Sequence, residues 1–151
     1  MIPALIIGRK GSTGFPNKNI TNFVGRPLMT YPILAAQNSK LVDEIYISTD
    51  SDKIREIAMS HGLKNIDRPE ELATNDALAE DAFAHGYREI KKDSNQEIEF
   101  IVLLFCNGAC ITPGIIDKGI ELLRNDKNED FDSAATSSLY NMWSPLRAKK
   151  I

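Results

Sequence analysis

Short apolar runs alternate with segments of helical periodicity along most of this chain, and no other feature of the sequence constrains the fold as strongly. Four runs rich in branched and aromatic residues are predicted to be strands: residues 2–7, 44–48, 99–106 and, more weakly, 132–138. Between them, apolar residues recur at helical spacing in residues 28–37, 51–60, 77–92 and 112–124. This alternation predicts an α/β fold, a Rossmann-like three-layer sandwich with a mostly parallel sheet and helices on both faces. Ligands of such sheets bind beyond the carboxyl ends of the strands.

Length and composition favour one globular domain. The chain has 151 residues, of which 42% are apolar, so it can bury a core. Its longest apolar stretches, residues 4–7 and 100–106, fall far short of the roughly 20 residues that a membrane span needs. Because Met1 is followed by no basic region or cleavable apolar segment, we expect a cytoplasmic protein with no membrane contact. Cys106 and Cys110 are too close together for a disulfide scaffold and are expected to be reduced.

The charge is distributed unevenly along the chain. No acidic residue precedes Asp43, whereas five cations do: Arg9, Lys10, Lys18, Arg26 and Lys40. That segment carries +5, and the net charge of −3 leaves −8 for the rest. A nucleic-acid-binding protein is more often basic overall, with aromatic residues among its cations, so we expect no nucleic-acid partner. A local cationic cluster in an acidic protein favours a small anion.

The cations concentrate in the loop GRKGSTGFPNKN, residues 8–19, directly after the first predicted strand. This loop is not a P-loop, because Thr13 stands where the second glycine of that motif belongs. Nor do Gly8, Gly11 and Gly14 have the spacing of a dinucleotide-binding turn, which would also run straight into a helix. What remains is a flexible cationic loop, rich in backbone N–H donors, that suits a polyphosphate. The alternative is a surface loop whose glycines only make turns.

Beyond this loop, several spaced motifs resemble those of one family. The pattern R-x-G-S-x-G-x-x-N-K-N-I, from Arg9 to Ile20, is similar to the signature of the acylneuraminate cytidylyltransferases, the CMP-sialic acid synthetases and their relatives. Further matching segments follow in the family order: Gly25–Leu28, Ile47–Ser51, Arg68–Ala73, Asp81 and His85.

The resemblance implies nucleotidyl transfer assisted by Mg²⁺. A sugar hydroxyl or sugar phosphate would attack the α-phosphate of a nucleoside triphosphate and release pyrophosphate. Arg9 and Lys18 would be the catalytic cations that hold the triphosphate and offset charge on the leaving group. The nucleotide-binding residues that the resemblance implies are Gly8, Arg9, Gly11, Ser12, Gly14, Lys18, Asn19, Thr49 and Arg68.

Three of these residues have structural alternatives. Arg68 could instead be a surface ion-pair partner of Glu70 or Glu71. Asn19 could be a turn residue, and Thr49 could belong to the cap of the helix that follows it.

The chain also departs from the family pattern. The relatives usually read L-L-Q-P-T-S-P-L-R after the third strong strand, where glutamine and arginine face the sugar acid, but this chain reads Phe105–Ile111 after its two leucines. In the wider superfamily an aspartate that binds Mg²⁺ follows this strand, and Asn107 aligns with it as a weak, uncharged metal ligand. Hydroxyls expected near the base are absent from Ala77–Ala79. A sugar-1-phosphate nucleotidyltransferase that uses another base, such as guanine, and a catalytically silent nucleotide-binding domain therefore remain alternatives.

Members of the family run well past 200 residues. We therefore expect residues 1–151 to be a nucleotidyltransferase domain that is incomplete at its carboxyl end. The resemblance implies that the intact protein is a homodimer.

Overall fold

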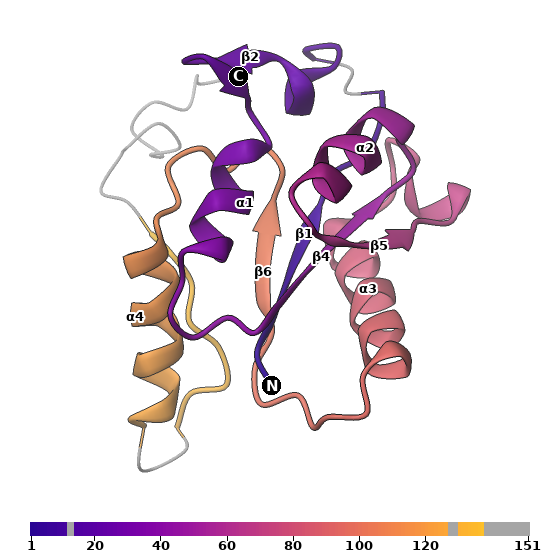
Figure 1. Cartoon of the computed structure of the whole chain (residues 1–151). Coiled ribbons are helices and arrows are strands. Elements are labelled where there is room, and N and C mark those ends of the chain that lie inside the picture. The colour runs from indigo at the N-terminus through magenta and orange to yellow at the C-terminus, as the bar shows by residue number, and fades with distance from the viewer. Residues whose placement is uncertain (12–13, 127–129, 138–151) are drawn as a thin grey trace, which may run out of the picture.

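A four-stranded parallel sheet forms the centre of the protein (Figure 1). The computed structural model describes residues 1–11, 14–126 and 130–137. The strand order is β5-β4-β1-β6, and all three neighbouring pairs are parallel. The bounds of the strands are β1 Pro3–Ile7, β4 Glu44–Thr49, β5 Lys64–Asp67 and β6 Val102–Phe105. The structure thus confirms the predicted α/β fold.

Helices cover both faces of this sheet (Figure 1). Their bounds are α1 Thr30–Gln37, α2 Asp52–Ser60, α3 Ala79–Asp93 and α4 Pro113–Arg124. Side chains alternate along β1, so Ala4 and Ile6 pack with α1, α2 and α4, whereas Leu5 and Ile7 pack with α3. This alternation produces the three layers.

Local caps explain where two of the helices begin. The Ser51 hydroxyl accepts a hydrogen bond from the backbone N–H of Ile54 at 3.5 Å at the start of α2. Thr112 caps α4 in the same way, and Pro113 follows as the first helical residue, where no N–H partner is needed.

Short elements connect the first strand to the first helix. A 3-10 helix, η1, spans Lys18–Ile20, and a hairpin pairs β2, Asn22–Phe23, with β3, Arg26–Pro27. The hydroxyl of Tyr31 on α1 donates to the Phe23 carbonyl at 2.7 Å and holds the hairpin against α1. A second 3-10 helix, η2, spans Glu70–Leu72.

The strand predicted over residues 132–138 is wrong for the part that can be judged: residues 132–137 form no strand, and residue 138 lies outside the described residues. Conversely, β5 was missed, because its sequence Lys-Asn-Ile-Asp has one buried residue, Ile66, and no apolar run. The hairpin was also missed, since each of its strands has only two residues.

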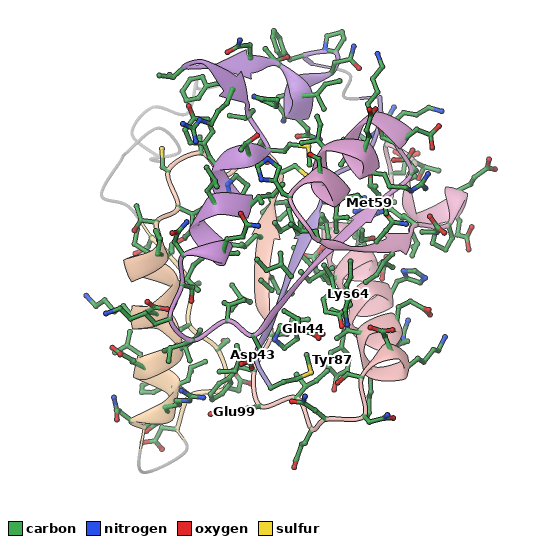
Figure 2. The ribbon with its side chains drawn as sticks, viewed as in Figure 1. Asp43, Glu44, Met59, Lys64, Tyr87 and Glu99 are labelled. Atoms are coloured by element: carbon green, nitrogen blue, oxygen red, sulfur yellow. The ribbon has the colours of Figure 1, made fainter. Side chains whose placement is uncertain are left out.

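A polar cluster ties β4, β5 and α3 together at the amino ends of the strands, where Glu44 and Lys64 are labelled in Figure 2. The Lys64 Nζ atom lies 3.0 Å from Glu44 Oε2 and 3.0 Å from Asp93 Oδ2. The Tyr46 hydroxyl donates to Glu44 Oε2 at 2.6 Å. Hydrogen bonds from Tyr46 and Lys64 lower the pKa of Glu44, and hydrogen bonds from Lys64 and Tyr46 lower the pKa of Asp93.

Within the described residues, no helix is both long enough and apolar enough to cross a membrane.

Candidate functional site

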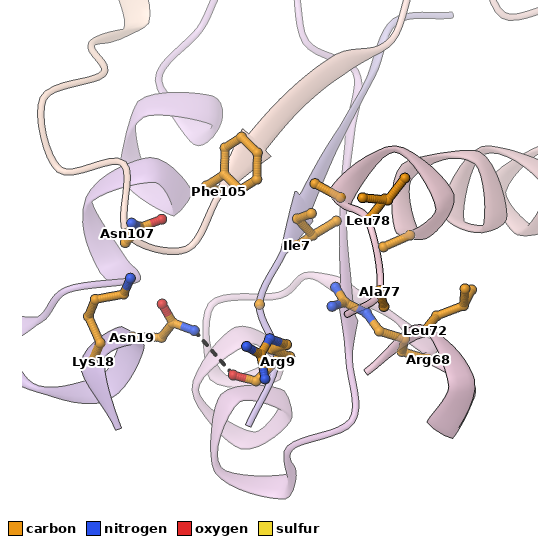
Figure 3. Close-up of a pocket in the computed structure, with 13 residues that line it drawn as sticks. Ile7, Arg9, Lys18, Asn19, Arg68, Leu72, Ala77, Leu78, Phe105 and Asn107 are labelled. Carbon is orange, nitrogen blue, oxygen red and sulfur yellow. Dashed lines mark hydrogen bonds between the residues drawn. The ribbon is translucent and has the colours of Figure 1, made fainter. Parts of the chain in front are cut away.

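A cavity of about 210 Å³ lies at the carboxyl ends of the strands, where the fold predicts a ligand (Figure 3). Ile7 and Phe105, the last residues of β1 and β6, contribute to its wall. Polar side chains of five residues line the cavity: Arg9, Lys18, Asn19, Arg68 and Asn107. The remaining lining is apolar apart from Gly8: Ile7, Leu72, Ala77, Leu78, Ala79, Ala82 and Phe105.

Three of the predicted residues bring positive charge into this cavity from separate parts of the chain. Arg9 belongs to the loop after β1, Lys18 opens η1, and Arg68 directly follows β5. Among the described residues that line the cavity there is no carboxylate. The electrostatic character of the cavity therefore favours an anionic ligand.

The loop after β1 approaches β6 too closely for a side chain at its first residue. A Cβ atom added to Gly8 would overlap the Sγ atom of Cys106, which is fully buried. Burial raises the pKa of the Cys106 thiol to about 12, so the group next to Gly8 stays neutral. Gly11 has a φ of +74°, a left-handed conformation that glycine adopts without steric cost. Gly8 thus permits the close approach of the loop to Cys106, and Gly11 permits its left-handed backbone conformation.

Backbone hydrogen bonds hold the loop in place. The N–H of Lys10 donates to Asp50 Oδ1 at 2.8 Å, which ties the loop to the end of β4. The side-chain amide of Asn19 donates to the Arg9 carbonyl at 3.4 Å, as drawn in Figure 3. Asn19 therefore has a structural contact as well as a place in the cavity wall. Lys10 and Gly11 also line a second, smaller cavity of about 20 Å³ next to α2.

Arg68 lines the cavity and is nevertheless buried, with an exposed fraction of 8%. Its Nε–H donates to Ser48 Oγ at 3.2 Å, and its Nη2 donates to the Ser48 carbonyl at 2.6 Å. Burial lowers the pKa of Arg68, while the negative charge of Asp50 opposes that shift. The surface ion pair with Glu70 or Glu71 is therefore excluded, since none of the ion pairs among the described residues includes Arg68.

The other predicted nucleotide-binding residues have different positions. Thr49 is fully buried, lines neither cavity, and its hydroxyl accepts from the N–H of Ser51 at 3.1 Å. The structure thus supports the alternative in which Thr49 stabilises the turn before α2. Gly14 is exposed and lies outside both linings. Ser12 lies outside the described residues.

Two segments that the sequence analysis matched to the family contribute to the apolar wall. Leu72 belongs to Arg68–Ala73, and Leu78 belongs to Ala77–Ala79, the segment expected near the base. The sequence did not assign these two leucines to the site individually, because nothing in their residue type points to a ligand. Ser48 falls within the matched segment Ile47–Ser51 but was not predicted as a site residue, because its contact with Arg68 joins residues 20 positions apart.

The lining of the cavity contains few groups that bind Mg²⁺ well. Mg²⁺ in proteins is bound through one or two carboxylates together with substrate phosphates. The described lining offers the neutral amides of Asn19 and Asn107 and no carboxylate. No group of three potential ligands from histidine, cysteine, aspartate and glutamate occurs in the parts of the chain that the structure describes. These residues therefore do not fit a magnesium ion that the protein alone would hold.

An open parallel sheet with a cationic cavity at its carboxyl edge defines an α/β protein whose cavity favours an anionic ligand. A sequence model of the family described as "Cytidylyltransferase" matches residues 3–141. The chain therefore belongs to the cytidylyltransferase family.

Several relatives are similar over part of their length. The chain is 29% identical over 136 residues to a pseudaminic acid cytidylyltransferase of Campylobacter jejuni, a match that covers 90% of this chain and 58% of that protein. It is 39% identical over 85 residues to an N-acylneuraminate cytidylyltransferase of Escherichia coli, covering 56% of this chain and 20% of the relative. The chain thus spans less than two thirds of the length of these relatives.

Solved structures share the fold. A CMP:2-keto-3-deoxy-manno-octonic acid synthetase complexed with CTP superposes with a TM-score of 0.67 at 20% identity, over 83% of this chain and 48% of that one. A cytidylyltransferase of Leptospira borgpetersenii superposes with a TM-score of 0.63 at 26% identity, over 83% and 50% of the two chains.

Proposed function

We propose that this chain carries the nucleotide-binding part of a CMP-sugar synthetase, which joins CMP from CTP to a sugar acid and releases pyrophosphate. The observation that carries this proposal is the convergence of Arg9, Lys18 and Arg68 on one cavity without a carboxylate in its described lining. Membership of the cytidylyltransferase family supports CTP as the nucleotide.

In the proposed reaction a hydroxyl oxygen of the sugar attacks the α-phosphorus of CTP. A new oxygen–phosphorus bond forms, the bond from the α-phosphorus to the bridging oxygen breaks, and pyrophosphate leaves with that oxygen. The hydroxyl proton passes to solvent or to a base that we do not assign. The catalytic contribution of Arg9 and Lys18 is to hold the triphosphate in line and to offset the charge that develops on pyrophosphate.

In this proposal the other groups of the site contact different parts of the nucleotide. Gly8 and Gly11 shape the loop whose backbone N–H groups would contact the phosphates. Asn19 and Arg68 would contact the ribose or the edge of the base, because a guanidinium is a planar donor. Gly14 and Ser12 remain predicted members of the phosphate-binding loop, whereas the position of Thr49 removes it from the groups that we assign to the nucleotide.

The sugar that would accept CMP is proposed from the relatives. The relatives are named for pseudaminic acid and N-acylneuraminic acid, which are supporting precedents for an acidic sugar. This chain has Phe105 and Ile111 where the family pattern has glutamine and arginine, and we propose a sugar acid as the class of acceptor.

Three further expectations belong to the proposal. Mg²⁺ would enter with CTP on its phosphate oxygens, the intact protein would be a homodimer, and its location would be the cytoplasm. Each comes from the sequence and the family resemblance.

The proposal is tested by isothermal titration of the chain with CTP, UTP, GTP and ATP, each with and without Mg²⁺. We expect CTP to bind most tightly, and Arg9→Ala or Lys18→Ala to weaken its affinity at least about tenfold, the effect of losing a charge-assisted contact. Lys40→Ala is the matched control, because Lys40 is an exposed cation of the same segment that lies outside the cavity lining. Preference for GTP would instead support a sugar-1-phosphate nucleotidyltransferase. Equal losses in all three variants would contradict the site assignment.

A further inference from the structure

We propose that Ser48 is a positioning residue that fixes the guanidinium of Arg68 and the start of the loop after β1 relative to each other. This inference rests on the proposed function, because it concerns the same cavity. Ser48 lies in β4, one residue before its end, and its exposed fraction is 0%. It contacts the ligand cavity only through other residues, since it is not part of the lining.

The first half of the argument is the contact with Arg68. Ser48 accepts from two different nitrogens of the guanidinium, with its hydroxyl oxygen at 3.2 Å and its carbonyl oxygen at 2.6 Å. Two acceptors on one residue fix both the position and the plane of the group. Within the described residues these contacts use two of the five N–H donors of Arg68, which leaves three for a ligand in the cavity.

The second half is the contact with the loop. The Ser48 carbonyl that accepts from Arg68 also accepts from the N–H of Gly8 at 3.2 Å. Gly8 is the residue at which the loop leaves β1, and the next residue is Arg9. The Ser48 carbonyl therefore links Arg68 to the start of the loop that carries Arg9.

The charge of Arg68 explains why such a fixed position matters. The guanidinium is buried, and no ion pair among the described residues includes it. Its charged surroundings are mixed, since Asp50 attracts it and Arg9 repels it. A buried cation with neutral partners gains from an anionic or carbonyl oxygen of a ligand, provided that it does not have to move to reach it. Ser48 supplies that fixed position before the ligand arrives.

The hydrogen bond itself is tested without any nucleotide, by the ¹⁵N NMR signal of the Arg68 Nε–H. A buried, hydrogen-bonded N–H exchanges slowly with water. We expect a protected signal in the wild-type protein, identified by its loss in Arg68→Lys, which has no Nε–H. In Ser48→Ala the signal should shift and exchange faster, because its acceptor is gone. An unchanged signal in Ser48→Ala overturns the proposal.

The consequence for the site is tested by a double-mutant cycle on CTP affinity. We expect Ser48→Ala to weaken CTP binding about tenfold in the wild-type background, the size of one lost hydrogen bond. In the Arg68→Lys background the same substitution should change the affinity less than about twofold, since the Nε–H is already absent. A full effect of Ser48→Ala in that background would show that Ser48 does not act through Arg68.

A matched control separates positioning from general loss of a buried hydroxyl. Thr30 is buried, and its hydroxyl oxygen has no hydrogen-bond partner among the described residues. Thr30→Val should leave CTP affinity unchanged, and an equal loss there would overturn the proposal. If the wild-type protein binds no CTP, the proposed function fails, and with it the role of Ser48 in nucleotide binding. The NMR signal still decides whether Ser48 holds the Arg68 guanidinium by a hydrogen bond.

Discussion

The α-carbon of Gly8 lies against the side chain of Cys106, so that a methyl group at residue 8 would occupy the place of the sulfur atom. Gly8 begins the loop that carries Arg9, and Cys106 follows β6. The loop after β1 therefore packs directly against Cys106, the residue that follows the neighbouring strand β6.

We therefore expect Gly8→Ala to lower the free energy of unfolding by about 1–3 kcal/mol, the usual cost of overpacking a filled site. Urea denaturation measures this loss. The double variant Gly8→Ala/Cys106→Ala has room for the added methyl group, so it should be less destabilised than the two single variants predict by addition. Strict additivity would contradict the contact.

Asp50 is expected to act on the loop through its hydrogen bond with the Lys10 backbone and not through its charge. Asp50→Ala removes the acceptor and should weaken CTP binding about tenfold, whereas Asp50→Asn keeps an acceptor and should stay within about twofold of the wild type. Isothermal titration of the two variants distinguishes these roles. A similar loss in both would assign the effect to the charge.

Asn107 provides a test of metal binding. Asn107→Asp places a carboxylate in a lining that has none among the described residues. Without Mg²⁺ this variant should bind CTP more weakly than the wild type, because a negative charge faces the phosphates. Added Mg²⁺ should strengthen binding more in the variant than in the wild type, since the ion favours a carboxylate beside phosphate oxygens. Titrations with MgCl₂ or with EDTA measure the difference, and an identical response to Mg²⁺ would show that residue 107 does not contact a metal ion bound with CTP.

The cluster around Lys64 predicts how stability depends on pH. The pKa values of Glu44 and Asp93 are lowered in the folded protein, so both carboxylates bind protons more readily when the chain is unfolded. Their contribution to stability is present above their ordinary values of 4.5 and 3.8, and it is lost as the pH falls through the lowered values of the folded state.

Lys64→Met removes the cation that both carboxylates share. The variant should have a lower free energy of unfolding than the wild type at pH 7, and this difference should be smaller at pH 3. Urea denaturation at each pH measures both values. A difference that is the same at both pH values would show that the ion pairs do not contribute.

Much of the fold could be predicted from local pattern, because β1, β4 and β6 are apolar runs and Ser51 and Thr112 are helix caps. β5 could not, because a short edge strand needs few buried residues. The strand predicted wrongly at residues 132–137 also reflects a weak local signal, since a run of small and polar residues indicates neither strand nor loop strongly.

The candidate site was predicted in part. The cations Arg9, Lys18 and Arg68 were chosen from the sequence, and the structure brings them to one cavity. Thr49 shows the limit of that approach, because a hydroxyl next to a strand end serves a turn or a ligand equally well by sequence. The contact of Ser48 with Arg68 depends on β4 and β5 becoming neighbours in the sheet, and that information is not local.

The central place of β1 in the sheet has a consequence for how the cavity comes into being. β1 pairs with β4 on one side and with β6 on the other, and these partners begin at Glu44 and Val102. Because these partners are distant in the sequence, we expect the cavity around Arg9 to be complete only after both segments have paired with β1. A ligand of the cavity would bind only molecules in which the sheet is complete. The appearance of ligand binding during refolding would therefore report when the sheet has formed.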